Sequence, residues 1–164
     1  MPLKEVPQEN GSADPDYLAK LQMDCARTDS QRFIEYSERS TGQLRNKMIS
    51  LGYSAETAEA TVEWAVKYGF VDDNRFSEMF AASKIMGKLR LKVELNKRGV
   101  GEEAISHILS SLSDESEFSD VAAAVRKKYG GIVNRETAVR RAAGWLERRG
   151  YSGEFIHRIL REVL

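Results

Sequence analysis

Two pairs of basic residues occupy matching positions in two helical segments, each of which ends at a glycine. In each pair the two residues stand nine and two positions before the glycine. The pairs are Arg90 with Lys97, before Gly99, and Arg141 with Arg148, before Gly150. Residues seven apart lie on one helix face, about two turns from each other. Each pair is therefore a candidate surface for an acidic partner or a polyanion, or else a solvated helix face whose side chains cover the edge of the core.

Further basic residues lie beside these pairs and belong to the same candidate surface. They are Lys88, Lys92, Arg98, Arg149 and Arg75. Arg75 follows Asp72 and Asp73, which we interpret as a helix cap. The Arg75 side chain either pairs with one of these aspartates or reaches a partner.

Few residues of this chain could support covalent or metal chemistry. A single cysteine, Cys25, excludes an intramolecular disulfide and a cysteine-based zinc site. Two histidines, His107 and His157, leave little for a metal site or a nucleophilic triad. Phosphate-cradling glycine loops and paired histidine ligands are absent from the sequence. The sequence therefore predicts a protein that is not an enzyme and needs no metal or cofactor.

The charge of the chain is unevenly distributed, although its formal total is zero. Residues 75–100 carry a net charge of +5, residues 101–120 carry −6, and residues 121–164 carry +6. The two basic blocks either attract a polyanion locally or form ordinary solvated helix faces. No apolar run approaches the roughly 20 residues that span a bilayer, and the N-terminus lacks the apolar stretch of a secretory signal. We expect a cytoplasmic protein with no membrane partner.

Helices are predicted for most of the chain. The three prolines fall within the first fifteen residues, and apolar residues recur at helical spacing after them. Residues 1–15 are expected to form a flexible tail. The predicted helices lie near 16–27, 29–39, 42–51, 55–68, 74–86, 88–98, 102–112, 116–129, 135–149 and 153–163.

An internal repeat groups these helices into similar units. The segments STGQLRNKMISLGYS (40–54), GKLRLKVELNKRGVG (87–101) and AVRRAAGWLERRGYS (138–152) align without gaps on a shared glycine. An apolar pair at i, i+4 precedes each glycine and three apolar positions at helical spacing follow it, which predicts an antiparallel helical hairpin. A preceding helix completes each unit. We therefore expect an all-α fold, an elongated and curved tandem array of three three-helix modules. The modules are expected at 29–72, 73–115 and 116–164, after a partly flexible tail of residues 1–28.

Two motifs follow one another in the middle of the chain. The first comprises Gly69, Phe70, Val71, Asp72, Asp73, Arg75 and Phe76, and the second comprises Gly87, Leu91, Glu94, Leu95, Arg98, Gly99 and Val100. Their order and spacing resemble those of the RecX family of recombination regulators. The segments 37–54 and 146–160 are similar to the first and last repeats of that family. The resemblance covers roughly residues 29–164 and implies three tandem three-helix modules.

The resemblance also implies a function. Members of the family bind in the helical groove of the RecA filament on DNA and inhibit RecA's ATP hydrolysis, strand exchange and coprotease activity. On this interpretation Arg90, Lys97, Arg141 and Arg148, which we call the basic track, face the filament of RecA and DNA. The protein is expected to act as a monomer. The alternative is a helical protein that binds single- or double-stranded DNA without RecA.

Overall fold

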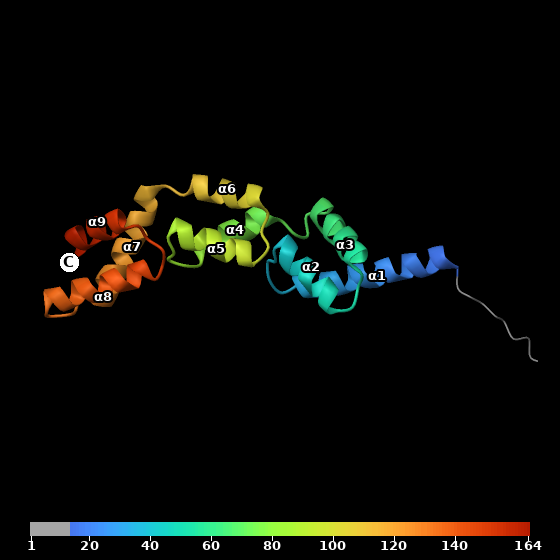
Figure 1. Cartoon of the computed structure of the whole chain (residues 1–164), viewed down its shortest axis with the longest axis horizontal. Coiled ribbons are helices and arrows are strands. Elements are labelled where there is room, and N and C mark those ends of the chain that lie inside the picture. The colour runs from blue at the N-terminus through green and yellow to red at the C-terminus, as the bar shows by residue number, and fades with distance from the viewer. Residues whose placement is uncertain (1–13) are drawn as a thin grey trace, which may run out of the picture.

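The computed structural model describes residues 14–164, in which all regular secondary structure is helical (Figure 1). The helices of this part of the chain are α1 (Pro15–Ile34), α2 (Thr41–Ser50), α3 (Ala55–Lys67), α4 (Asp73–Ala82), α5 (Lys88–Lys97), α6 (Glu102–Ser111), α7 (Asp114–Tyr129), α8 (Arg135–Glu147) and α9 (Gly153–Val163). The predicted all-α fold is confirmed. The flexible tail expected over residues 1–15 lies almost wholly outside the described residues.

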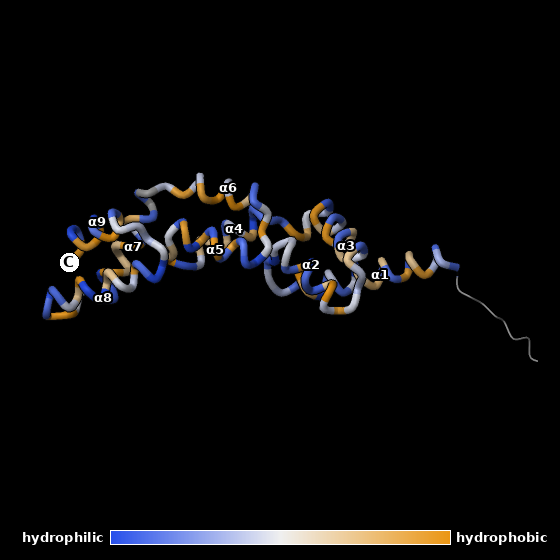
Figure 2. Tube along the Cα trace, viewed as in Figure 1, coloured by the Kyte–Doolittle hydropathy of each residue, from blue (hydrophilic) through white to orange (hydrophobic). Residues whose placement is uncertain are grey.

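The helices form three groups of three, each around its own small hydrophobic core. The first core is built from α2, α3 and the turn after α3, and Phe33 and Ile34 of α1 pack against it. The buried residues of the three core clusters are Leu44, Met48, Ala58, Val62, Ala65 and Val71; Phe76, Leu91, Leu95, Val100, Ala104, Ile105 and Ile108; and Val121, Ala122, Val125, Tyr129, Ala142, Trp145, Leu146, Tyr151, Ile156 and Ile159. Figure 1 shows the groups following one another in an elongated row. Hydrophobic and hydrophilic residues alternate along the helices (Figure 2), so each helix buries one face in its own group.

The first helix is longer than the sequence predicted. Two helices were expected, over 16–27 and 29–39, whereas one continuous helix runs from Pro15 to Ile34. Neither proline nor glycine interrupts residues 16–34, so nothing there stops the helix. The carboxylate of Asp14 accepts a hydrogen bond from the amide of Asp16 and caps its start. The expected boundary between residues 28 and 29 therefore lies inside α1, whose first half extends beyond the other helices (Figure 1).

The three aligned glycines end helices as predicted. Gly52, Gly99 and Gly150 have φ of +93°, +68° and +80°, the left-handed region that glycine adopts readily. The amide after each glycine donates to a carbonyl five residues earlier, as from Tyr53 to Met48 at 3.3 Å, which closes the turn in a Schellman motif. This repeated turn sends each following helix back along its partner. The predicted hairpins are thereby confirmed.

Candidate partner-binding surface

Successive modules meet at two joints that use equivalent parts of the repeat. At joint 1 the start of α2 lies against the turn between α5 and α6. The amide of Gly42 donates to the carbonyl of Gly99 at 3.1 Å, and the hydroxyl of Ser40 donates to the carbonyl of Arg98. A Cβ atom on Gly42 would lie 2.5 Å from Cα of Gly99, so the two backbones touch where no side chain fits.

At joint 2 the start of α5 lies against the turn between α8 and α9 in the same way. The amide of Gly87 donates to the carbonyl of Arg149 at 2.9 Å. The Arg90 guanidinium Nη1 donates to the carbonyl of Arg148 at 3.4 Å. A Cβ atom on Gly87 would collide with the backbone of Gly150, so this joint also depends on a backbone contact between glycines.

Asp73 strengthens joint 1 in a way that sequence reasoning missed. Its Oδ1 accepts from the amide of Thr41 at 2.8 Å, and its Oδ2 accepts from the Thr41 hydroxyl and from the amide of Gly101, both at 2.8 Å. One carboxylate thus connects α4 to the start of α2 and to the turn before α6. The helix cap is Asp72 alone, which accepts from the amides of Asn74 and Arg75. The cap interpretation is therefore confirmed for Asp72 and wrong for Asp73, because only one of two adjacent residues can occupy the N-cap position.

Three of the predicted cations around α5 converge on one carboxylate, Glu94. Its oxygens lie 2.7 Å from Nη1 of Arg98, 3.4 Å from Nη2 of Arg90 and 3.9 Å from Nζ of Lys97. The hydrogen bond from Arg98, together with the charges of all three cations, lowers the pKa of Glu94. The i, i+4 spacing of Glu94 from Arg90 and Arg98 is the sequence signal that could have identified this cluster. Glu94 therefore offsets part of the charge of the basic track.

The cations of the third module remain more open. Arg141 and Arg148 are exposed on α8 and at its C-cap. Arg149 is half-buried, with its guanidinium carbon 4.0 Å from the centre of the Trp145 ring. Because Arg90 contacts the carbonyl of Arg148, joint 2 brings together cations from two modules. Arg90 and Arg148, one from each basic pair, therefore meet in space.

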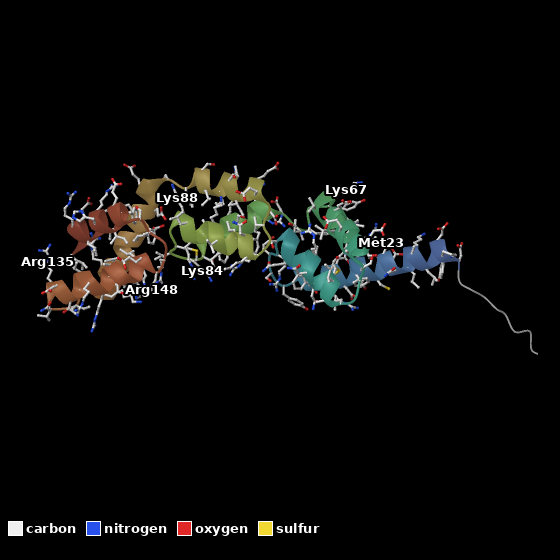
Figure 3. All side chains as sticks on the ribbon, in the orientation of Figure 1. Met23, Lys67, Lys84, Lys88, Arg135 and Arg148 are labelled. Atoms are coloured by element: carbon white, nitrogen blue, oxygen red, sulfur yellow. The ribbon has the colours of Figure 1, made fainter. Side chains whose placement is uncertain are left out.

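Other predicted site residues lie apart from this meeting point. Lys92 pairs with Glu102 at 3.3 Å. Lys88 lines a different hollow and lies on the opposite edge of Figure 3 from Arg148. Arg75 does not pair with Asp72 or Asp73: its Nε donates to Glu38 at 2.7 Å, and its Nη atoms donate to the carbonyls of residues 69 and 70 at 3.4 Å. That set of contacts makes Arg75 a link between the start of α4 and the segment before α2.

The chemistry that these groups offer is recognition by charge and hydrogen bonding. Within residues 14–164, no group of three or more histidine, cysteine, aspartate or glutamate side chains is placed to hold a metal ion. Among the same residues, no helix has the length and apolar character needed to cross a membrane. The described part of the chain therefore offers two backbone joints and a group of cations around joint 2.

The sequence matches two domain models of one family. Residues 26–64 match the first three-helix domain of RecX, and residues 72–109 match the second three-helix domain of RecX. The first match begins inside α1 and ends inside α3, and the second runs from Asp72 into α6. Both matches therefore fall on three-helix groups of the structure.

Whole-chain comparisons give the same family. The regulatory protein RecX of Trichlorobacter lovleyi is 31% identical over 91% of this chain and 97% of its own length, and that of Clostridium acetobutylicum is 30% identical over 92% and 76%. A crystal structure of a regulatory protein RecX superposes with a TM-score of 0.75 at 14% identity, covering 99% of this chain and 82% of its own. RecX from Lactobacillus salivarius superposes with a TM-score of 0.71 at 15% identity, covering 88% and 97%. Three-helix modules, sequence identity along most of the chain and the shared fold all agree, and the chain belongs to the RecX family of regulatory proteins.

Proposed function

We propose that this protein regulates RecA by binding in the groove of the RecA filament on DNA, where it inhibits ATP hydrolysis, strand exchange and coprotease activity. Family membership supports this proposal. The observation that carries it is the repeated glycine joint, which links the three modules into one row (Figure 1). An elongated row of modules can contact several successive subunits of a filament at once. Such binding favours one filament geometry over others, so inhibition follows from different affinities for different filament states.

The surface proposed to face the filament is the basic track. Lys88, Lys92, Arg98, Arg149 and Arg75 are the further candidates. The contact between Arg90 and Arg148 across joint 2 supports a surface that is continuous from the second module into the third. We assign the modules to residues 29–72, 73–115 and 116–164, and expect the protein to act as a cytoplasmic monomer without catalytic chemistry or a cofactor.

The test is RecA's DNA-dependent ATP hydrolysis in the presence of substoichiometric protein. We expect inhibition by the unmodified chain. Changing Arg90, Lys97, Arg141 and Arg148 to alanine should raise the concentration for half-inhibition by about tenfold, because charge on an interface speeds encounter and orients the partner. Thermal unfolding should change little, since exposed charges contribute little to stability.

A matched control removes four exposed basic residues outside the track and the joints, namely Lys20, Lys67, Lys127 and Arg161. This control should inhibit as well as the unmodified chain. Failure of the unmodified protein to inhibit under any filament-forming condition would contradict the function. Equal inhibition by the track variant and the control would leave the function standing and remove the assigned surface.

A further inference from the structure

A hollow of about 570 Å³ opens at joint 2, between the loop that connects α4 to α5 and the end of α8. We call it the joint-2 pocket, and its lining residues are Ser83, Lys84, Ile85, Met86, Arg90, Trp145, Arg148 and Arg149. Lys84 and Arg148 lie along the same edge of the molecule in Figure 3. The sequence did not single out Lys84, because it stands in the loop before α5 and not on a repeated helix face. The fold thus adds a fourth cation to three that were already candidates.

The lining of the joint-2 pocket is positively charged. Half of its residues are lysine or arginine, and none is a carboxylate. Two other hollows at this joint both include Glu117, and one of them also includes Glu78 and Asp120. The absence of carboxylates is therefore specific to this side of the joint. Like charges gathered around one volume repel one another, and a bound anion would offset that repulsion.

Most of these cations have no acidic partner. Within residues 14–164, Arg90 is the one pocket cation that forms an ion pair, at 3.4 Å from Glu94. Lys84 lies over the ring of Phe80, with Nζ 5.3 Å from the ring centre, and Arg149 lies over Trp145. Contacts with a ring face position a cation without neutralising it. Lys84 and Arg149 are therefore positioned by aromatic rings, and among the described residues no carboxylate pairs with Lys84, Arg148 or Arg149.

Trp145 adds an unmatched donor to the pocket lining. The side chain is more than nine-tenths buried, and its indole Nε1 has no acceptor among the described residues. Buried indole N–H groups normally have a partner. The lining therefore combines a buried N–H that has no acceptor with three cations that form no ion pair among the described residues.

A phosphate group matches this donor set better than a single carboxylate does. Arginine binds phosphate through pairs of parallel hydrogen bonds, and the oxygens of a phosphate accept from several such groups at once. One carboxylate carries a single negative charge and two oxygens, which would leave most of these donors unpaired. Phosphates of a nucleic-acid backbone or of free pyrophosphate supply the same chemistry.

We propose that the joint-2 pocket is a phosphate-binding site. The site does not depend on RecA, because every residue that forms it belongs to this chain. Lys84 and Arg90 come from the second module, and Arg148 and Arg149 come from the third. A phosphate bound between them bridges the two modules and stabilises joint 2. Phosphate binding and the angle between modules are therefore coupled through one contact.

Binding is tested with the full chain, a labelled single-stranded oligonucleotide and fluorescence anisotropy over a range of salt concentrations. We expect the double variant Lys84→Ala and Arg148→Ala to bind about tenfold more weakly. The slope of log K against log salt should become shallower by about 1.4, since each single-strand phosphate contact contributes about 0.7. Both side chains are exposed, so circular dichroism and thermal unfolding should be unchanged.

The matched control is the double variant Lys67→Ala and Arg161→Ala. Lys67 also lies over an aromatic ring, that of Tyr68 at 5.8 Å, and Arg161 is exposed on α9. The control removes the same charge, and the proposal expects its affinity and salt slope to match those of the unmodified chain. Equal weakening by both variants would show that binding follows net charge alone and would overturn the site.

Two further titrations distinguish the source of the phosphate. Pyrophosphate is followed by Trp145 fluorescence in a Trp64→Phe background, and polyglutamate competes against the oligonucleotide. A saturable pyrophosphate response that the Lys84→Ala and Arg148→Ala variant loses supports a site for free phosphates. Oligonucleotide binding without that response supports a site for the nucleic-acid backbone. Binding of neither, or polyglutamate competition as strong as that of unlabelled DNA, would overturn a phosphate site.

Discussion

The two joints share a backbone contact but differ in the side chains around it. At joint 1 the carboxylate of Asp73 accepts three hydrogen bonds that connect α4, the start of α2 and the turn before α6. At joint 2 an arginine reaches across to a carbonyl, and cations surround a hollow beside the contact. Both joints thus share a close backbone contact of glycines, while the neighbouring side chains differ between a carboxylate at joint 1 and cations at joint 2.

The largest effect is expected from a side chain placed inside a joint. Gly99→Val forces a β-branched residue into a left-handed conformation, which costs about 1–2 kcal/mol. A Cβ atom there would also lie 2.7 Å from Cα of Gly42, and overpacking of this kind costs about 1–3 kcal/mol more. Urea unfolding should show the combined loss, and small-angle scattering should show a changed overall shape because the first two modules separate.

Gly52→Val isolates the cost of the left-handed conformation from the cost of the steric overlap. Gly52 has a φ of the same sign, but a Cβ atom there meets nothing within 4 Å. This variant should lose about 1–2 kcal/mol of stability and keep the scattering profile of the unmodified chain. The same change of shape in both variants would mean that the glycine contact does not determine how the modules are arranged.

A smaller effect is expected when joint 1 loses only its carboxylate. Asp73→Ala leaves the amides of Thr41 and Gly101 without their acceptor, at a cost of about 1–3 kcal/mol. Asp72→Ala removes the cap of α4, at a cost of about 1 kcal/mol, without touching the joint. Hydrogen exchange at the Thr41 and Gly101 amides should accelerate in Asp73→Ala and not in Asp72→Ala. Unchanged exchange in Asp73→Ala would contradict the role of this carboxylate.

The features within one module could be predicted from the sequence, whereas the contacts between modules could not. Helical periodicity and the turn glycines are local signals, and they predict the helical hairpins, which the structure confirms. The joints connect residues 58 positions apart, as in Ser40 to Arg98 and Arg90 to Arg148. No local pattern says which side chain of a repeat will contact the next one. Lys84 and Asp73 were missed for this reason.

The prediction of two separate helices over 16–27 and 29–39 was wrong for a different reason. Hydrophobic periodicity indicates two helices there, yet a helix without glycine or proline has no local signal to end. Tertiary contacts reach only part of α1: Ala26 and Ser30 are buried, whereas Tyr17, Leu18 and Leu21 are exposed. In the sequence, the change from exposed to buried residues along α1 looks like a boundary between two elements. In the structure the helix continues through that position.

Glu94→Gln is expected to change stability least among these variants. It also tests most directly how the two joints differ. Glu94 is bonded to Arg98, whose carbonyl belongs to joint 1, and to Arg90, whose side chain lines the joint-2 pocket. Because the pKa of Glu94 is lowered in the folded protein, its stabilising contribution is present above the usual glutamate pKa and is lost as pH falls through the folded value. Urea midpoints measured from about pH 6 to about pH 3 should therefore fall slightly less in Glu94→Gln than in the unmodified chain.

Anion affinity should change in the opposite direction to stability. With the carboxylate gone, Arg90 loses its acidic partner, and the oligonucleotide should bind Glu94→Gln more tightly at pH 7 than it binds the unmodified chain. Glu59→Gln is the control, since Glu59 pairs with Arg45 at 2.6 Å in the first module and does not line the joint-2 pocket. The pKa of Glu59 is also lowered, by the hydrogen bond from Arg45. Glu59→Gln should therefore show the same change in the pH dependence of stability as Glu94→Gln, but no change in oligonucleotide affinity. A gain in affinity in both variants would mean that total charge, and not the release of Arg90 at joint 2, controls anion binding.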